Sequence, residues 1–132
     1  MKVKSQTDKL VQVRNFISEA ARTFGFKEDD VDKIALAVDE ACTNIIKYAY
    51  EHDTNKEIEV SVHTSNGKFE VVITDYGKDF NPNAVKLPDM QEYVKHYQKG
   101  GLGMYLMKSL MDRIEYNITP GVKNEVRLTK FL

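Results

Sequence analysis

Glu40 and Asn44 lie one helical turn apart in the stretch LAVDEACTNIIKYAY, residues 36–50, whose apolar spacing predicts a helix. At about 100° per residue, both side chains fall on the face opposite the apolar stripe. The helix thus offers a carboxylate, which can take up a proton, beside a carboxamide, which can donate and accept hydrogen bonds. The pair also suits an ordinary solvated helix face on which Lys47 balances the charge of Glu40.

Asp75 ends the strand-like run EVVITD, and Gly77 follows two positions later. A buried carboxylate at the end of a strand can accept a hydrogen bond from an exocyclic amine such as that of adenine. A glycine beside it lets the backbone pass close to the ring. Because Asp-x-Gly is also common in simple turns, the pattern indicates a base pocket only in combination with other motifs.

Glycines gather in KGGLGMYLMKSLMD, where an irregular segment becomes a helix; they are Gly100, Gly101 and Gly103. Backbone amide groups at a helix N-terminus bind phosphate, and missing side chains allow close approach. A glycine cluster of this kind can also be only a hinge. Phosphate binding therefore stays open on this motif alone.

Three stretches together resemble a known family: DEACTNIIKYAY, DYGKDF and GGLGMYLMKSLMD. In order and spacing they are similar to the N, G1 and G2 boxes of the GHKL ATPases, the superfamily of gyrase, histidine kinases and mismatch-repair ATPases. Their residues are more similar still to those of its small bacterial branch, the anti-sigma factor serine/threonine-protein kinases. The resemblance covers nearly the whole chain, including the terminal EVRLTKFL.

The resemblance implies a role for each matching residue. Glu40 would act as general base, and Asn44 would hold Mg²⁺ against the phosphates of ATP, in keeping with the preference of this hard cation for oxygen ligands. Asp75 would bind adenine, and Gly77 would shape its pocket. The ATP phosphates would lie against Gly100, Gly101, Leu102 and Gly103.

The segment between the second and third boxes, residues 76–100, would include the nucleotide lid. One departure is visible there, because Asp79 stands where the wider superfamily has the second glycine of its Asp-x-Gly-x-Gly pattern.

By the same resemblance, the chain would be an ATP-dependent serine/threonine-protein kinase and anti-sigma factor. Its substrate would be a STAS-type anti-anti-sigma protein, whose phosphorylation frees the kinase to hold a sigma factor and so regulates transcription. Kinases of this branch usually work as homodimers, and a homodimer is expected here. The alternative is a nucleotide-gated binding module that uses the same pocket and transfers no phosphate. A structural domain with an empty pocket would require three motifs to coincide by chance.

Other phosphoryl-transfer architectures find little support in the sequence. There is no GxxxxGK[ST] loop and no HRD or DFG set. A histidine kinase would need a dimerisation helix pair with a phospho-accepting histidine, for which the chain has no room. His52, His63 and His96 show no metal-ligand spacing.

The elements that must position these residues follow from hydrophobic periodicity and turn residues. Strands are predicted at residues 1–5, 57–64, 68–75, 115–119 and 124–131, and helices at 7–24, 27–50 and 102–114. Gly25 is expected to end the first helix, and Asn66-Gly67 and Pro120-Gly121 to form hairpin turns. This order predicts an α/β (α+β) two-layer sandwich, a mixed, mainly antiparallel sheet covered on one face by helices, the Bergerat fold of GHKL ATPases.

Composition limits the function classes. The 132 residues fit a single domain, 1–132, and a net charge of -1 with a pI near 6.3 gives no electrostatic footprint for nucleic acid or an anionic membrane. No apolar run is long enough to span a bilayer, so we expect a cytoplasmic protein without direct nucleic-acid or membrane partners. The single cysteine, Cys42, lies on an apolar helix face and is expected to be a buried side chain.

Overall fold

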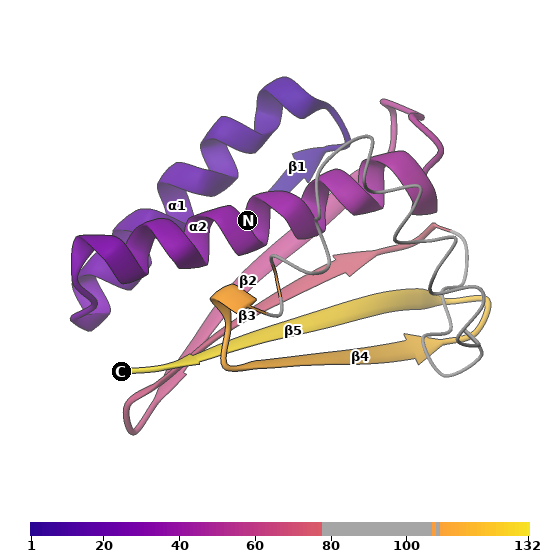
Figure 1. The fold of residues 1–132 in the computed structure, drawn as a ribbon. Helices are drawn as coiled ribbons and strands as arrows, with labels where there is room; N and C mark the ends of the chain where they lie inside the picture. The colour runs from indigo at the N-terminus through magenta and orange to yellow at the C-terminus, as the bar shows by residue number, and fades with distance from the viewer. Residues whose placement is uncertain (78–106, 108) are drawn as a thin grey trace.

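One antiparallel sheet forms one layer of the computed structural model, which describes residues 1–77, 107 and 109–132. Its strands are β1 (Lys2–Lys4), β2 (Glu57–Ser65), β3 (Lys68–Asp75), β4 (Arg113–Thr119) and β5 (Lys123–Phe131). Their order across the sheet is β1-β2-β3-β5-β4, so β3 lies at its centre (Figure 1). Every pairing between neighbouring strands is antiparallel.

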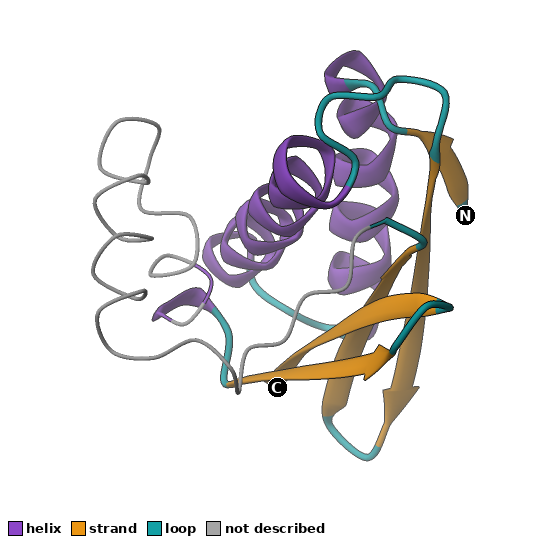
Figure 2. Cartoon of the chain, turned by 90° about the vertical axis from the view of Figure 1, so that its right-hand side faces the viewer, coloured by secondary structure: helices purple, strands orange, loops and turns teal. Residues whose placement is uncertain are grey.

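Helices form the second layer and cover one face of this sheet (Figure 2). A short 3-10 turn, Thr7–Lys9, precedes α1 (Leu10–Phe24), and α2 (Glu28–Asn44) continues into a π-helical turn, Ile45–Ala49. Gly25 ends α1 as predicted, with a φ of 119° that a residue with a side chain rarely adopts. The arrangement confirms the predicted two-layer α/β fold.

Apolar spacing in the sequence predicts which side chains of α1, α2, β2 and β3 face inward, and these side chains form the core between the two layers. Those that are fully buried are Val13, Ile17, Ala21, Val31, Ile34, Val38, Cys42, Ile58, Val60, Phe69, Val71 and Ile73. Burial raises the pKa of the Cys42 thiol to about 12, so this cysteine stays protonated and acts as a small apolar side chain, as expected.

The third predicted helix ends earlier than its pattern indicates. Residues 107, 109 and 110 are helical, but β4 already begins at Arg113, so the expected extension to Ile114 is wrong. Asp112 explains the change: its N–H donates to the Thr129 carbonyl at 2.9 Å, and its carboxylate accepts the Phe131 N–H at 2.7 Å. Pairing with β5 therefore overrides the local helical pattern.

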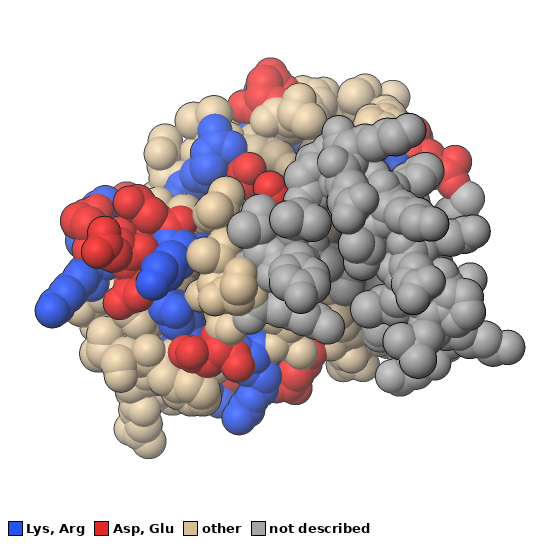
Figure 3. All heavy atoms as spheres, in the orientation of Figure 1, with Lys and Arg blue, Asp and Glu red and all other residues tan. Residues whose placement is uncertain are grey.

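Charges of both signs are interspersed over the described surface. On the open face of the sheet, Glu70 contacts both Lys68 at 2.6 Å and Arg127 at 3.3 Å. On the helical side, Lys and Arg alternate with Asp and Glu over the part of the chain that is described (Figure 3). Within that part, no helix is both long enough and apolar enough to cross a bilayer.

Candidate functional site

Glu40 and Asn44 are half-buried on α2 rather than fully solvated. The apolar spacing of this helix predicts a buried stripe of Val31, Ile34, Ala35, Val38, Cys42, Ile45 and Ala49. The buried face is wider than this stripe, because Ala37 and Ala41 are buried as well. Ala37 lies three residues before Glu40 and is therefore its neighbour on the helix surface, and Ala41 directly follows Glu40 in the chain. The glutamate therefore stands at the border between core and solvent.

The carboxylate of Glu40 is a stronger base than that of a solvated glutamate. Partial burial is the largest cause that raises its pKa, and the charge of neighbouring Asp39 raises the pKa further. The charge of Lys47 lowers it. Asp39 in turn pairs with Arg14 of α1, with 2.6 Å between Nη1 and Oδ1. A carboxylate in this setting is suited to take a proton from a hydroxyl group.

Asp75 is buried at the end of β3, with 5% of its surface exposed. Its Oδ1 accepts hydrogen bonds from the Gly77 N–H and from Asn124 Nδ2, both at 2.9 Å. Burial raises the pKa of Asp75, and the two hydrogen bonds oppose that rise. Because both bonds end on Oδ1, Oδ2 can accept a further donor. The predicted position of Asp75, at a strand end just before a glycine turn, is confirmed.

Asn124 was missed by the sequence reasoning. It lies directly opposite Asp75 in the register of β3 and β5 and is itself buried. A signal was present in the chain, since Asn124 is in phase with the inward-facing Val126 and Leu128. A polar side chain in phase with buried ones needs a polar partner, and here that partner is Asp75.

Gly77 packs directly against the π-helical turn. A Cβ added to it would lie 2.7 Å from the carbonyl carbon of Ala49 and 2.8 Å from its Cβ, and closer still to its carbonyl oxygen. No side chain fits at that distance, so the absence of a Cβ is a requirement of this contact. The end of β3 is thereby held against the end of the helix that carries Glu40 and Asn44.

The last turn of the predicted second helix differs from the expectation. The helix is α-helical only to Asn44, and the following turn is wider, with the Tyr50 N–H donating to the Ile45 carbonyl at 2.9 Å. Turns of this π type occur often at functional sites. Here the wider turn brings the Ala49 carbonyl against Gly77, a contact that the local pattern does not predict.

The structure thus brings two of the three predicted motifs together. The distance along the helix from Glu40 to Ala49 is about 13 Å. The predicted phosphate-binding residues of the third motif, Gly100, Gly101, Leu102 and Gly103, lie outside the described residues. So do Asp79 and residues 78–100 of the segment predicted to include the lid.

Comparison with known proteins gives one family. Residues 3–130 match the model of the histidine kinase-like ATPase domain. The chain is 34% identical to the serine-protein kinase RsbW of Bacillus subtilis, covering all of this chain and 84% of that protein. It is 32% identical to the serine-protein kinase RsbW of Halalkalibacterium halodurans, with 100% and 82% covered.

Two solved structures have the same fold. The RsbU and RsbW domains of Rv1364c from Mycobacterium tuberculosis match with a TM-score of 0.65 at 14% identity, over 100% of this chain and 32% of that one. The histidine kinase domain of a blue-light-activated histidine kinase from Erythrobacter litoralis matches with a TM-score of 0.60 at 15% identity, over 98% and 62%.

Proposed function

Because the chain belongs to the histidine kinase-like ATPase domain family, in the branch of the RsbW serine-protein kinases, we propose that it transfers phosphate from ATP to a serine or threonine of a protein partner. The observation that carries this proposal is the contact between Gly77 and Ala49. This contact joins a buried carboxylate suited to a purine amine to a helix that bears a raised-pKa glutamate.

Adenine recognition would rest on Asp75. The carboxylate would accept the exocyclic amine through Oδ2, while Gly77 and Asn124 hold Oδ1. Because Gly77 has no side chain, the adenine ring could lie close to the end of β3. Guanine presents a carbonyl where adenine presents the amine, so the site should discriminate against GTP.

The phosphates would extend along α2 towards Asn44 and Glu40. The amide oxygen of Asn44 suits Mg²⁺, which would neutralise phosphate charge and take its remaining ligands from phosphate and water. Glu40 would take the proton of the attacking hydroxyl as the bond from oxygen to the γ-phosphorus forms and ADP leaves. Gly100, Gly101, Leu102 and Gly103 are proposed to bind the phosphates from the other side.

The proposed biological role is partner switching. The substrate would be a STAS-type anti-anti-sigma protein, and its phosphorylation would release it from the kinase, which could then hold a sigma factor. A homodimer is proposed on the same family ground. The likeness to the RsbW serine-protein kinases supports these proposed partners.

The direct test uses ATP labelled in the γ-phosphate and a purified STAS protein encoded near this chain's gene. We expect label to appear on one serine or threonine of that protein, in a reaction that needs Mg²⁺ and that GTP supports much less. If ATP binds but no label reaches any such protein, the binding-module alternative replaces the kinase. If no nucleotide binds, both readings fail.

A pH profile tests the setting of Glu40. Transfer needs the ionised carboxylate, so kcat/KM should fall as the pH drops through the pKa of Glu40, which burial and Asp39 raise. Asp39→Asn removes one of these two causes and should move the acid limb to lower pH, while the new side chain can still accept a bond from Arg14. The exposed Asp32→Asn should leave the limb in place. An unchanged limb in Asp39→Asn would contradict the assignment.

A further inference from the structure

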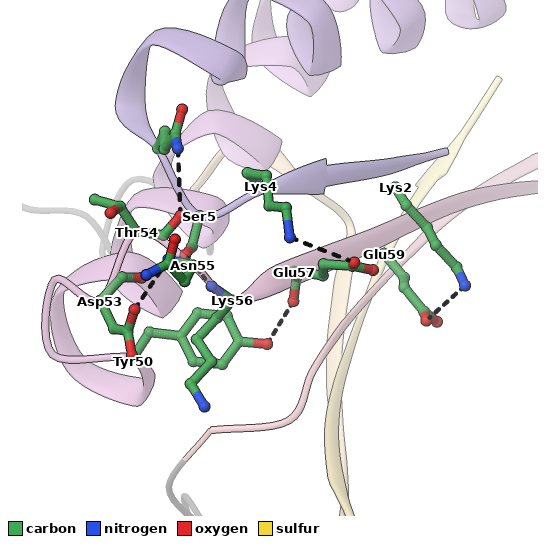
Figure 4. A network of polar contacts seen from close by, with 11 residues as sticks. Lys2, Lys4, Ser5, Tyr50, Asp53, Thr54, Asn55, Lys56, Glu57 and Glu59 are labelled. Atoms are coloured by element: carbon green, nitrogen blue, oxygen red, sulfur yellow. Dashed lines mark hydrogen bonds and ion pairs between the residues drawn. The ribbon is translucent and has the colours of Figure 1, made fainter.

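The Tyr50 hydroxyl connects three segments that are far apart in the sequence. Tyr50 directly follows the π-helical turn and is 5% exposed. Its hydroxyl donates to the Glu57 carbonyl at the start of β2, as Figure 4 shows. The same oxygen accepts the Tyr76 N–H at 2.9 Å, just beyond the end of β3.

These two bonds fix the peptide that links Asp75 to Gly77. Tyr76 is the residue between them, and its N–H is held by Tyr50. The side chain of Tyr76 lies on the open face of the sheet, where its hydroxyl donates to Glu59 at 3.1 Å. The backbone of this turn is therefore held from the helical side, and its side chain from the opposite side.

The orientation of the Asp75 carboxylate depends on this turn. The Gly77 N–H is one of the two donors that hold Asp75 Oδ1, and its direction follows from the preceding peptide. Without the Tyr50 hydroxyl, the Tyr76 N–H would lose its buried acceptor, and only the Tyr76 side chain and the packing of Gly77 would still hold the turn. The other donor, Asn124, would then hold the carboxylate alone.

Tyr50 is itself held in place from its own loop. The Ser5 hydroxyl donates to the Asp53 carbonyl and accepts the Lys56 N–H at 3.2 Å, which ties residues 53–56 to the end of β1 (Figure 4). The chain is thus held on both sides of Tyr50, by the π-helical turn before it and by this loop after it.

We propose that Tyr50 is a positioning residue for base recognition: its hydroxyl orients the turn from Asp75 to Gly77 so that the carboxylate is aimed at the exocyclic amine of adenine. The inference rests on the proposed ATP site and names a residue that sets its specificity. It also gives the π-helical turn a purpose, since this turn places Tyr50 beside the strand end.

The experiment compares two nucleotides and two variants. ATP and purine riboside triphosphate differ only by the exocyclic amine, and their dissociation constants are measured by calorimetry with the parent, with Tyr50→Phe and with Tyr48→Phe. The parent should prefer ATP by about tenfold or more. In Tyr50→Phe the preference should fall to about threefold or less, with little loss of affinity for the nucleotide that lacks the amine.

Tyr48→Phe is the matched control, because it removes the same hydroxyl from an exposed position in the same turn. It should keep the parent's preference. If Tyr50 had only a structural role, Tyr50→Phe would weaken the binding of both nucleotides by the same factor. The ratio of the two dissociation constants would then be unchanged, and that outcome would overturn the inference. A parent that does not distinguish the two nucleotides would instead overturn the adenine site itself, and the role of Tyr50 with it.

If Tyr50→Phe fails to fold, the inference is tested on the parent protein instead. Hydrogen exchange at the amides of Tyr76 and Gly77 should slow when ATP binds and should change much less when purine riboside triphosphate binds. Only ATP carries the amine that binds the Asp75 carboxylate, and this turn orients that carboxylate. Equal protection by both bound nucleotides would overturn the inference.

Discussion

Glu40→Gln should lower phosphoryl transfer by about a hundredfold or more and leave ATP binding intact. Glutamine has the size and polarity of glutamate but cannot take the proton of the attacking hydroxyl. The half-buried setting of Glu40, which raises its pKa, makes this loss larger than at a solvated position. The rate is measured as labelled phosphate on the partner in a single turnover, and affinity is measured separately by calorimetry.

Asp32→Asn is the matched control for this experiment, since it removes a carboxylate from the exposed face of the same helix. Its transfer rate should equal that of the parent. A Glu40→Gln variant that transfers as fast as the parent would show that Glu40 is not the base. A variant that loses ATP binding as well would assign Glu40 to the nucleotide rather than to the hydroxyl.

Asp75→Asn should weaken ATP binding by roughly a hundredfold and yet raise the melting temperature of the free protein. Asparagine can keep an oxygen towards Gly77 and Asn124, but it then presents an NH₂ group to the adenine amine, and two donors repel. ATP should therefore stabilise the parent against heat and barely stabilise the variant.

The gain in stability follows from the pKa of Asp75, which burial raises. A carboxyl group with a higher pKa in the folded state binds protons more readily there than in the unfolded state. The unfolding free energy therefore falls as the pH rises from the unfolded to the folded pKa, and above both values the cost is fully present. Removing the charge removes this cost at neutral pH, which should raise the melting temperature by a few degrees.

Differential scanning with and without ATP tests both halves of this expectation. A variant that is stabilised by ATP as strongly as the parent would remove Asp75 from the binding site. A variant that is less stable than the parent without nucleotide would show that the hydrogen bonds to the ionised carboxylate outweigh its burial. GTP added to the parent serves as the specificity control.

Local sequence patterns were enough to predict most helices and strands and the places of the motifs on them. Alternation of apolar residues predicted β2 and β3 with the correct inward faces, because neighbouring side chains of a strand point to opposite sides. The spacing on α1 and α2 predicted the buried stripes, and Gly25 predicted where α1 ends. These features are local, and so the positions of Glu40 and Asp75 on their elements were predictable as well.

The contacts that join these positions into a candidate site come from residues that are distant in the sequence. The bond from Asn124 to Asp75 joins residues 49 positions apart, and that from Tyr76 to Tyr50 joins residues 26 apart. The change to a π-helical turn after Asn44 and the end of the third helix before Arg113 depend on such partners. A local pattern reports which side of an element is apolar, but it does not report which distant backbone will need a donor, an acceptor or the space of a missing side chain.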